Sequence, residues 1–99
     1  MSIQNVYTNV LKFEWDPNKN ARNLRQHGID FEDAVGIFDR PVLEGLDDRC
    51  DYGEERIIAY GEVNQHVIAV VYTWRAGSRR IISARKAARN EREAYYRAL

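Results

Sequence analysis

Residues 56–87 hold three stretches of strand-forming side chains separated only by short turns, and this pattern most restricts how the chain can fold. Each stretch is rich in β-branched and aromatic residues, which favour strands. Connections as short as Asn64-Gln65 and Ala76-Gly77-Ser78 join strands that pair antiparallel. The sequence therefore predicts an antiparallel meander of three strands, Arg56–Val63, His66–Arg75 and Arg79–Ala87.

Helix signals stand on both sides of this meander. Asp16-Pro17 provides an N-cap acceptor followed by a proline at the first helical position, and Gly28 suits the left-handed residue after the last turn. Asp30 can cap a second helix in the same way. Asn90 and Glu93 have the spacing of a capping box, which predicts that a C-terminal helix begins there.

Two further strands complete the predicted order, Val10–Trp15 before the first helix and Val42–Leu46 before the meander. The order β-α-α-β-β-β-β-α, an antiparallel sheet with two N-terminal helices and one C-terminal helix, defines an α+β fold. We expect one domain over residues 10–99, because 99 residues divided into two cores would leave both too small to be stable. Residues 1–9 are polar and lack a sustained period, so we expect a flexible N-terminal extension.

The net charge of zero conceals a strong segregation of charge along the chain. Residues 30–62 carry three basic and eleven acidic side chains, whereas residues 63–99 carry eight basic and two acidic ones. A neutral total with a cationic end is compatible with an anionic partner, or with a partner protein that neutralises the basic patch.

The cysteine content and the absence of long apolar runs exclude several classes of protein. Cys50 is the single cysteine, so no internal disulfide can form, and no Cys/His spacing resembles a zinc site. No secretory signal and no apolar run of membrane-spanning length is present in the sequence. We therefore expect a cytoplasmic protein without a membrane anchor, a metal or another cofactor.

The predicted turns fix a strand register and hence the two faces of the sheet. Arg75 would lie opposite Arg79, and Tyr60 opposite Ala69. Because side chains alternate between faces, one face would gather Arg56, Tyr60, Arg75, Arg79 and Arg85. The other face, which includes Tyr72, Trp74 and Arg80, is more apolar and would pack against the helices. Several guanidinium groups on one open sheet favour binding of an RNA backbone, and the alternative is that they pair with the acids of residues 30–62.

Two groups of residues, in the right order and spacing over residues 12–96, resemble the signatures of the BrnT-type toxins. The N-terminal group is Lys12-Phe13-Glu14-Trp15-Asp16-Pro17, Lys19, Asn23-Leu24, His27-Gly28 and Phe31-Glu32-Asp33-Ala34. The C-terminal group is Glu54-Glu55-Arg56, Arg80-Ile81-Ile82-Ser83-Ala84-Arg85-Lys86-Ala87, Glu91-Arg92-Glu93 and Tyr95.

This resemblance implies a RelE-like fold and a ribonuclease activity that halts growth. It also implies a cognate BrnA-type antitoxin that binds the toxin and represses the shared operon, so that the complex would contact operator DNA through the antitoxin. RelE-like nucleases work with basic residues, sometimes with an acid, a histidine or a tyrosine, and without a metal. The ribose 2′-OH attacks the adjacent phosphorus, and arginines stabilise the charge that develops on the phosphoryl oxygens.

We therefore expect Arg56, Arg79 and Arg85 to clamp phosphate, with a salt bridge to a nearby acid as the alternative for each of them. Glu55 is a candidate general base or a residue that holds Arg56, and His27 is a candidate for acid–base work or for bonding the last carbonyls of its helix. The residues expected to bind RNA are Lys19, Tyr60, Arg75, Arg80 and Lys86.

The sequence thus predicts a metal-independent endoribonuclease toxin neutralised by an antitoxin. The alternative is a binding module without catalysis, in which the same basic face docks an acidic partner or nucleic acid.

Overall fold

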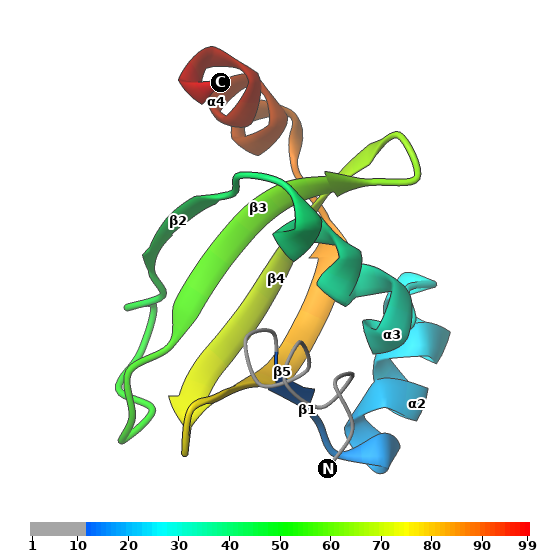
Figure 1. The fold of residues 1–99 in the computed structure, drawn as a ribbon, viewed down its shortest axis with the longest axis vertical. Coiled ribbons are helices and arrows are strands. Elements are labelled where there is room, and N and C mark those ends of the chain that lie inside the picture. The colour runs from blue at the N-terminus through cyan, green and yellow to red at the C-terminus, as the bar shows by residue number, and fades with distance from the viewer. Residues whose placement is uncertain (1–11) are drawn as a thin grey trace, which may run out of the picture.

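A computed structural model describes residues 12–99, so the predictions made for residues 1–9 and for the beginning of the strand at Val10 lie outside the described residues. The predicted α+β order is confirmed (Figure 1). The elements are β1 (Phe13–Glu14), α2 (Pro17–His27), α3 (Phe31–Ala34), the 3-10 helix η1 (Val35–Asp39), β2 (Leu43–Leu46), β3 (Ile57–Val63), β4 (His66–Arg75), β5 (Ser78–Lys86) and α4 (Arg89–Ala98).

The five strands form one sheet in the order β1-β5-β4-β3-β2. All neighbours pair antiparallel except β1, which runs parallel to β5 with Phe13 opposite Arg79, so the sheet is mixed rather than purely antiparallel. In Figure 1, α2 and α3 lie beside β5 at one edge of the sheet, the segment between α3 and β2 crosses over the sheet, and α4 stands beyond the end of the strands.

The first helix begins and ends as its sequence predicts. The side chain of Asp16 accepts a hydrogen bond of 2.8 Å from the Asn18 amide, and Gly28 takes a left-handed conformation with φ 72°. The second predicted helix begins correctly at its Asp30 cap, but its α-helical part is a single turn that continues as the tighter η1.

The last helix begins two residues earlier than the predicted capping box, with its N-cap at residue 90, places it. Its N-cap is Ala88, and the acid at the third helical position is Glu91 rather than Glu93. The Glu91 carboxylate accepts a hydrogen bond of 2.7 Å from the Ala88 amide. Alanine has no side-chain acceptor, so only this half of a capping box forms.

The core lies between the sheet and the α3–η1 segment. Gly61 on β3 allows η1 to approach closely, because a Cβ atom at this position would lie 2.6 Å from Cβ of Ile37. Trp74 was expected in the core, yet it is 51% exposed. The core cluster of buried residues is Phe31, Ala34, Ile37, Ala59, Ile68, Val70, Tyr72, Ile81 and Ala84.

The register between β4 and β5 differs from the prediction over half of the hairpin. The turn has two residues rather than three: Ala76 and Gly77 both have positive φ, and Arg75 pairs with Ser78. An irregularity at Val71/Tyr72 then restores the predicted pairing of Val71 with Ser83. The predicted register of the other hairpin, with Tyr60 opposite Ala69, is confirmed.

This change of register over the first half of β5 places its residues on the face opposite to the predicted one. Ile81 pairs with Tyr72 and is buried in the core, and Arg79 pairs with Trp74 on the same face. Arg80 instead joins Thr73 on the opposite face, where Arg79 was expected. We call the face covered by α3 and η1 the helix face, and the opposite one the far face.

Candidate functional site

A cleft of about 340 Å³ opens between α2 and the far face of the sheet. It brings together Lys19, His27 and Arg56, three of the residues that the sequence singled out. The lining residues are Lys19, Arg22, Asn23, Gln26, His27, Arg56, Ile82 and Ser83. Three of these side chains are cationic at neutral pH and none is a carboxylate, so the electrostatics of the cleft favour an anion.

Asn23 fixes α2 against the sheet. It is only 6% exposed, and its Nδ2 donates to the carbonyls of Ile29 and Ala84, both at 2.9 Å. Its Oδ1 accepts from the Ala84 amide at 3.2 Å. The pairing of β1 with β5 ends at Arg80, so no strand within residues 12–99 bonds the Ala84 amide and carbonyl on this edge. The side-chain amide of Asn23 makes these two hydrogen bonds in place of a longer β1.

Two local features aim side chains into this cleft. On α2, Lys19, Arg22 and Gln26 lie within one turn of Asn23 at helical spacing, so docking of Asn23 carries them to the sheet. On β5, the irregularity opposite Val71/Tyr72 places Ile82 and Ser83 both on the cleft lining, as expected where a bulge re-aims side chains.

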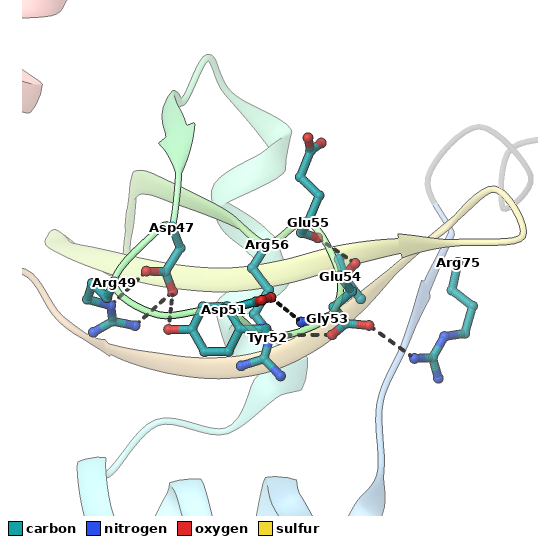
Figure 2. A network of polar contacts seen from close by, with 10 residues as sticks. Asp47, Arg49, Asp51, Tyr52, Gly53, Glu54, Glu55, Arg56 and Arg75 are labelled. Atoms are coloured by element: carbon teal, nitrogen blue, oxygen red, sulfur yellow. Dashed lines mark hydrogen bonds and ion pairs between the residues drawn. The ribbon is translucent and has the colours of Figure 1, made fainter.

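Arg56 immediately precedes β3, and its side chain lines the cleft. Two neighbouring side chains hold its guanidinium in place (Figure 2). Its guanidinium carbon lies 3.9 Å from the centre of the Tyr52 ring, and its Nε lies 3.3 Å from the Glu54 carboxylate. Glu54 also lies 3.6 Å from Arg75, so this acid bridges two of the predicted arginines. The ion pair given above as the alternative role of Arg56 is therefore present in the structure, with Glu54 as the acid.

The loop that carries Tyr52 and Glu54 is anchored by a buried acid. Asp47 is 7% exposed and accepts bonds of 2.7 and 2.8 Å from Arg49. The Asp47 amide donates to the Arg56 carbonyl at 2.8 Å, and the Thr73 hydroxyl donates to the Glu55 carbonyl at 2.8 Å. The hydrogen bonds from Arg49 hold the pKa of Asp47 below its usual value. The loop over residues 47–55 is therefore fixed at both ends.

Arg85 lies further along the far face and is bound by Glu91 from α4. Glu91 accepts two bonds from the Arg85 guanidinium, at 2.8 and 3.0 Å, and one of 2.8 Å from the Tyr60 hydroxyl. With the Ala88 amide, four donors surround this carboxylate. The hydrogen bonds from Arg85 are the main reason that the pKa of Glu91 falls to about 2. Glu91 therefore remains ionised and cannot serve as a proton carrier near neutral pH.

Comparison with known proteins identifies the group to which this architecture belongs. Residues 15–91 match the family described as "Ribonuclease toxin, BrnT, of type II toxin-antitoxin system". The chain belongs to the BrnT toxin family. The match confirms the resemblance drawn from the sequence signatures, and it includes the whole cleft and the pair formed by Arg85 and Glu91. A comparison with curated proteins finds no match.

Membership of this family gives the coarse function. A BrnT toxin is a ribonuclease toxin of a type II toxin–antitoxin system, so its substrate is RNA and its partner is an antitoxin protein.

The other predicted residues of this BrnT chain lie outside the cleft. Arg79 faces the helix side, where its guanidinium carbon lies 4.4 Å from the Phe38 ring centre and 4.6 Å from that of Trp74. Arg80 forms an ion pair of 2.8 Å with Glu14. Lys86 is exposed at the end of β5. The structure thus brings three of the predicted residues together in the cleft, joins Tyr60 to Arg85 through Glu91, and links Arg75 to Arg56 through Glu54. Arg79, Arg80 and Lys86 belong to none of these groups.

Sequence reasoning did not name five lining residues of the cleft as site residues: Arg22, Asn23, Gln26, Ile82 and Ser83. Arg22 had a signal, because its spacing from Lys19 places the two cations on one side of the first helix. Asn23, Ile82 and Ser83 stand in the family signatures, which give them no role. Gln26 had no signal, since an amide on a helix is a common surface residue.

Within residues 12–99, no group of three or more His, Cys, Asp or Glu side chains is arranged to hold a metal ion. Likewise, no helix in that range has the length and apolar character needed to cross a bilayer.

Proposed function

We propose that this BrnT toxin is a metal-independent endoribonuclease that binds the RNA backbone in the cleft between α2 and the far face. The observation that carries the proposal is the composition of the cleft: Lys19, Arg22 and Arg56 converge on it, and no acid lines it. A guanidinium can bind two phosphate oxygens at once and stays charged at any working pH. Two such groups with an ammonium make a site for a phosphodiester.

The proposed reaction is attack of a ribose 2′-OH on the adjacent phosphorus. The bond between O2′ and phosphorus forms while the bond from phosphorus to the 5′ oxygen breaks, which leaves a 2′,3′-cyclic phosphate and a 5′-hydroxyl. His27 would accept the 2′-OH proton as general base, and the departing 5′ oxygen would take a proton from solvent water to give the 5′-hydroxyl. Glu55, exposed beside Arg56, is the alternative base. Arg56, which lines the cleft, would stabilise the charge on the phosphoryl oxygens.

The far face suggests how a longer RNA would lie. Ser83 and Arg85 are two residues apart on β5, about 7 Å along the strand, so a chain leaving the cleft in this direction would reach Arg85 and Tyr60. Lys86 pairs with the buried Ile68 on the helix face, so it would not contact RNA on this path. In the other direction it would pass Arg75 and Arg80. Arg75 and Arg85 each hold a carboxylate in the free protein, so a phosphate would have to replace Glu54 or Glu91.

The partner follows from the family, and we propose its type. A BrnA-type antitoxin would bind this chain in the cytoplasm, and the complex would contact operator DNA through the antitoxin. The net excess of basic side chains over residues 63–99 supports an anionic or acidic partner.

A second function, RNA binding without cleavage, is favoured by one observation. Arg56, proposed to stabilise the reacting phosphate, and Arg85, proposed to bind RNA beyond the cleft, are both already paired with acids of the chain. Such pairs are typical of arginines that hold a surface together rather than act on a substrate.

The deciding experiment is incubation of the purified protein with labelled RNA in excess chelator. We expect cleavage that leaves cyclic phosphate ends, slowed about a hundredfold in Arg56→Ala through loss of transition-state stabilisation. Arg25→Ala is the matched control, because Arg25 is an exposed cation of α2 outside the cleft lining. Activity that the chelator abolishes would contradict the metal-independent mechanism. RNA that is bound but left intact by the folded protein would establish the binding module.

A further inference from the structure

The helix face carries an arginine whose surroundings are unlike those of the arginines on the far face. The Arg79 guanidinium carbon lies 4.4 to 5.9 Å from the centres of four aromatic rings, those of Phe13, Phe38, Tyr72 and Trp74. Stacking on aromatic faces holds a guanidinium in one orientation while leaving its polar edge available.

Arg79 has no acid partner among residues 12–99. Arg56, Arg80 and Arg85, which are half-buried like Arg79, each form an ion pair with a glutamate. In the same part of the chain, the buried Nε of Arg79 makes no hydrogen bond. Glu44 accepts instead from the hydroxyl of Tyr72. Residues 1–11 contain no Asp or Glu, so they cannot supply a carboxylate.

Large apolar side chains are exposed on the same face of the sheet as this guanidinium. Trp74 is 51% exposed and pairs with Arg79 across the strands. Leu46 is 63% exposed and lies in the cross-strand row of Ile57 and Tyr72, on the same face. Tryptophan, tyrosine and arginine are the residues that contribute most at protein–protein interfaces, where apolar neighbours exclude water around a central polar pair.

We propose that Arg79, Trp74 and Leu46 form a docking surface for the antitoxin, which would bring a carboxylate to Arg79 and apolar side chains to Trp74 and Leu46. The choice of the antitoxin as occupant rests on the proposed function, whereas the acid–apolar chemistry of the occupant rests on charge complementarity with Arg79. The surface lies on the helix face, opposite the far face that borders the RNA cleft, so it can hold an antitoxin without occupying the phosphate site.

The test is the affinity of the purified toxin for purified cognate antitoxin, measured by titration calorimetry. We expect Trp74→Ala and Arg79→Met each to weaken binding about thirtyfold or more, as loss of a central interface residue does. Met keeps an apolar chain between the rings, and Leu46→Ser provides a third variant at an exposed position. Arg97→Ala is the control, because Arg97 is an exposed arginine at the distant end of α4. Thermal melts establish that each variant is folded.

Several results would overturn the proposal. One is an affinity within about twofold of wild type in folded Trp74→Ala and Leu46→Ser. Another is loss of affinity in Arg56→Ala alone, which would place the antitoxin at the cleft. A third is self-association of the free toxin that Trp74→Ala abolishes, which would make a second copy the occupant. RNA cleavage by wild type and by Trp74→Ala is measured in parallel. Absence of cleavage with the expected affinity losses refutes the enzyme, and cleavage without those losses refutes the surface.

Discussion

The attachment of α2 to the sheet depends on one side chain, and removing its amide gives the sharpest prediction. Asn23→Ala deletes three hydrogen bonds, two to the Ala84 backbone and one to the Ile29 carbonyl. A hydrogen bond contributes about 1 kcal/mol net, so the loss is about 3 kcal/mol. The higher helix propensity of alanine returns about 0.6 kcal/mol. We therefore expect the free energy of unfolding to fall by about 2.4 kcal/mol.

Urea denaturation followed by tryptophan fluorescence and circular dichroism measures this change, and a matching melting temperature should drop by about 10 to 15 °C. Gln26→Ala is the control, because it removes an exposed amide from the same helix. If Asn23→Ala lost no more stability than Gln26→Ala, the Asn23 side chain would not be what attaches α2 to β5. Hydrogen exchange of the Ala84 amide, which should accelerate in the variant, reports on the same contact independently.

Three further results are expected. Glu91→Gln should lower stability most above pH 4.5, where the Glu91 carboxylate of wild type is ionised. The difference in urea midpoint between variant and wild type should shrink as the pH falls from 4.5 toward about 2, because the carboxylate of the folded protein becomes protonated near pH 2. A difference that does not change with pH would refute the role of the charge. Arg22→Ala should reduce the salt dependence of binding to single-stranded RNA by about 0.7 in the log–log slope, whereas Arg25→Ala should leave it unchanged; equal slopes would remove Arg22 from the phosphate site. Gly61→Ala should cost about 1 to 3 kcal/mol in the same urea assay, because its Cβ would lie 2.6 Å from that of Ile37; a stability equal to wild type would show that η1 can shift freely.

Much of the fold could be predicted because its signals are local. The Asp16 cap and the Gly28 stop are short-range features that fix the ends of α2. The two-residue turn at Asn64-Gln65, with both φ values positive, sets the register of β3 and β4 wherever that hairpin lies in the fold.

The start of β5 could not be predicted, because its outcome depends on packing across the sheet. Ile81 and Ile82 are equally apolar, so alternation alone does not show which of them belongs in the core. The structure buries Ile81 opposite Tyr72, which requires a two-residue turn with Ala76 at positive φ, a conformation that alanine seldom adopts.

The candidate site was predictable only in part for a similar reason. Lys19, His27 and Arg56 could be singled out as residue types, and the family signatures contained all three. Their meeting in one cleft depends on Asn23 bonding to Ala84, a contact between residues 61 positions apart.

The beginning of α4 also depends on tertiary contacts. Glu91 gains Arg85 and Tyr60 as hydrogen-bond partners, whereas Glu93 bonds only the exposed Arg89 within the described residues.

The bond pattern at Ala84 has a consequence for the behaviour of the protein at high concentration. An unpaired strand edge is a template on which another chain can add a strand, and such additions lead to aggregation. Beyond Arg80, β5 would offer such an edge, and the Asn23 amide occupies its Ala84 amide and carbonyl. A single side chain thereby closes the sheet to intermolecular pairing at this position, and we expect Asn23→Ala to aggregate on storage where Gln26→Ala stays monomeric.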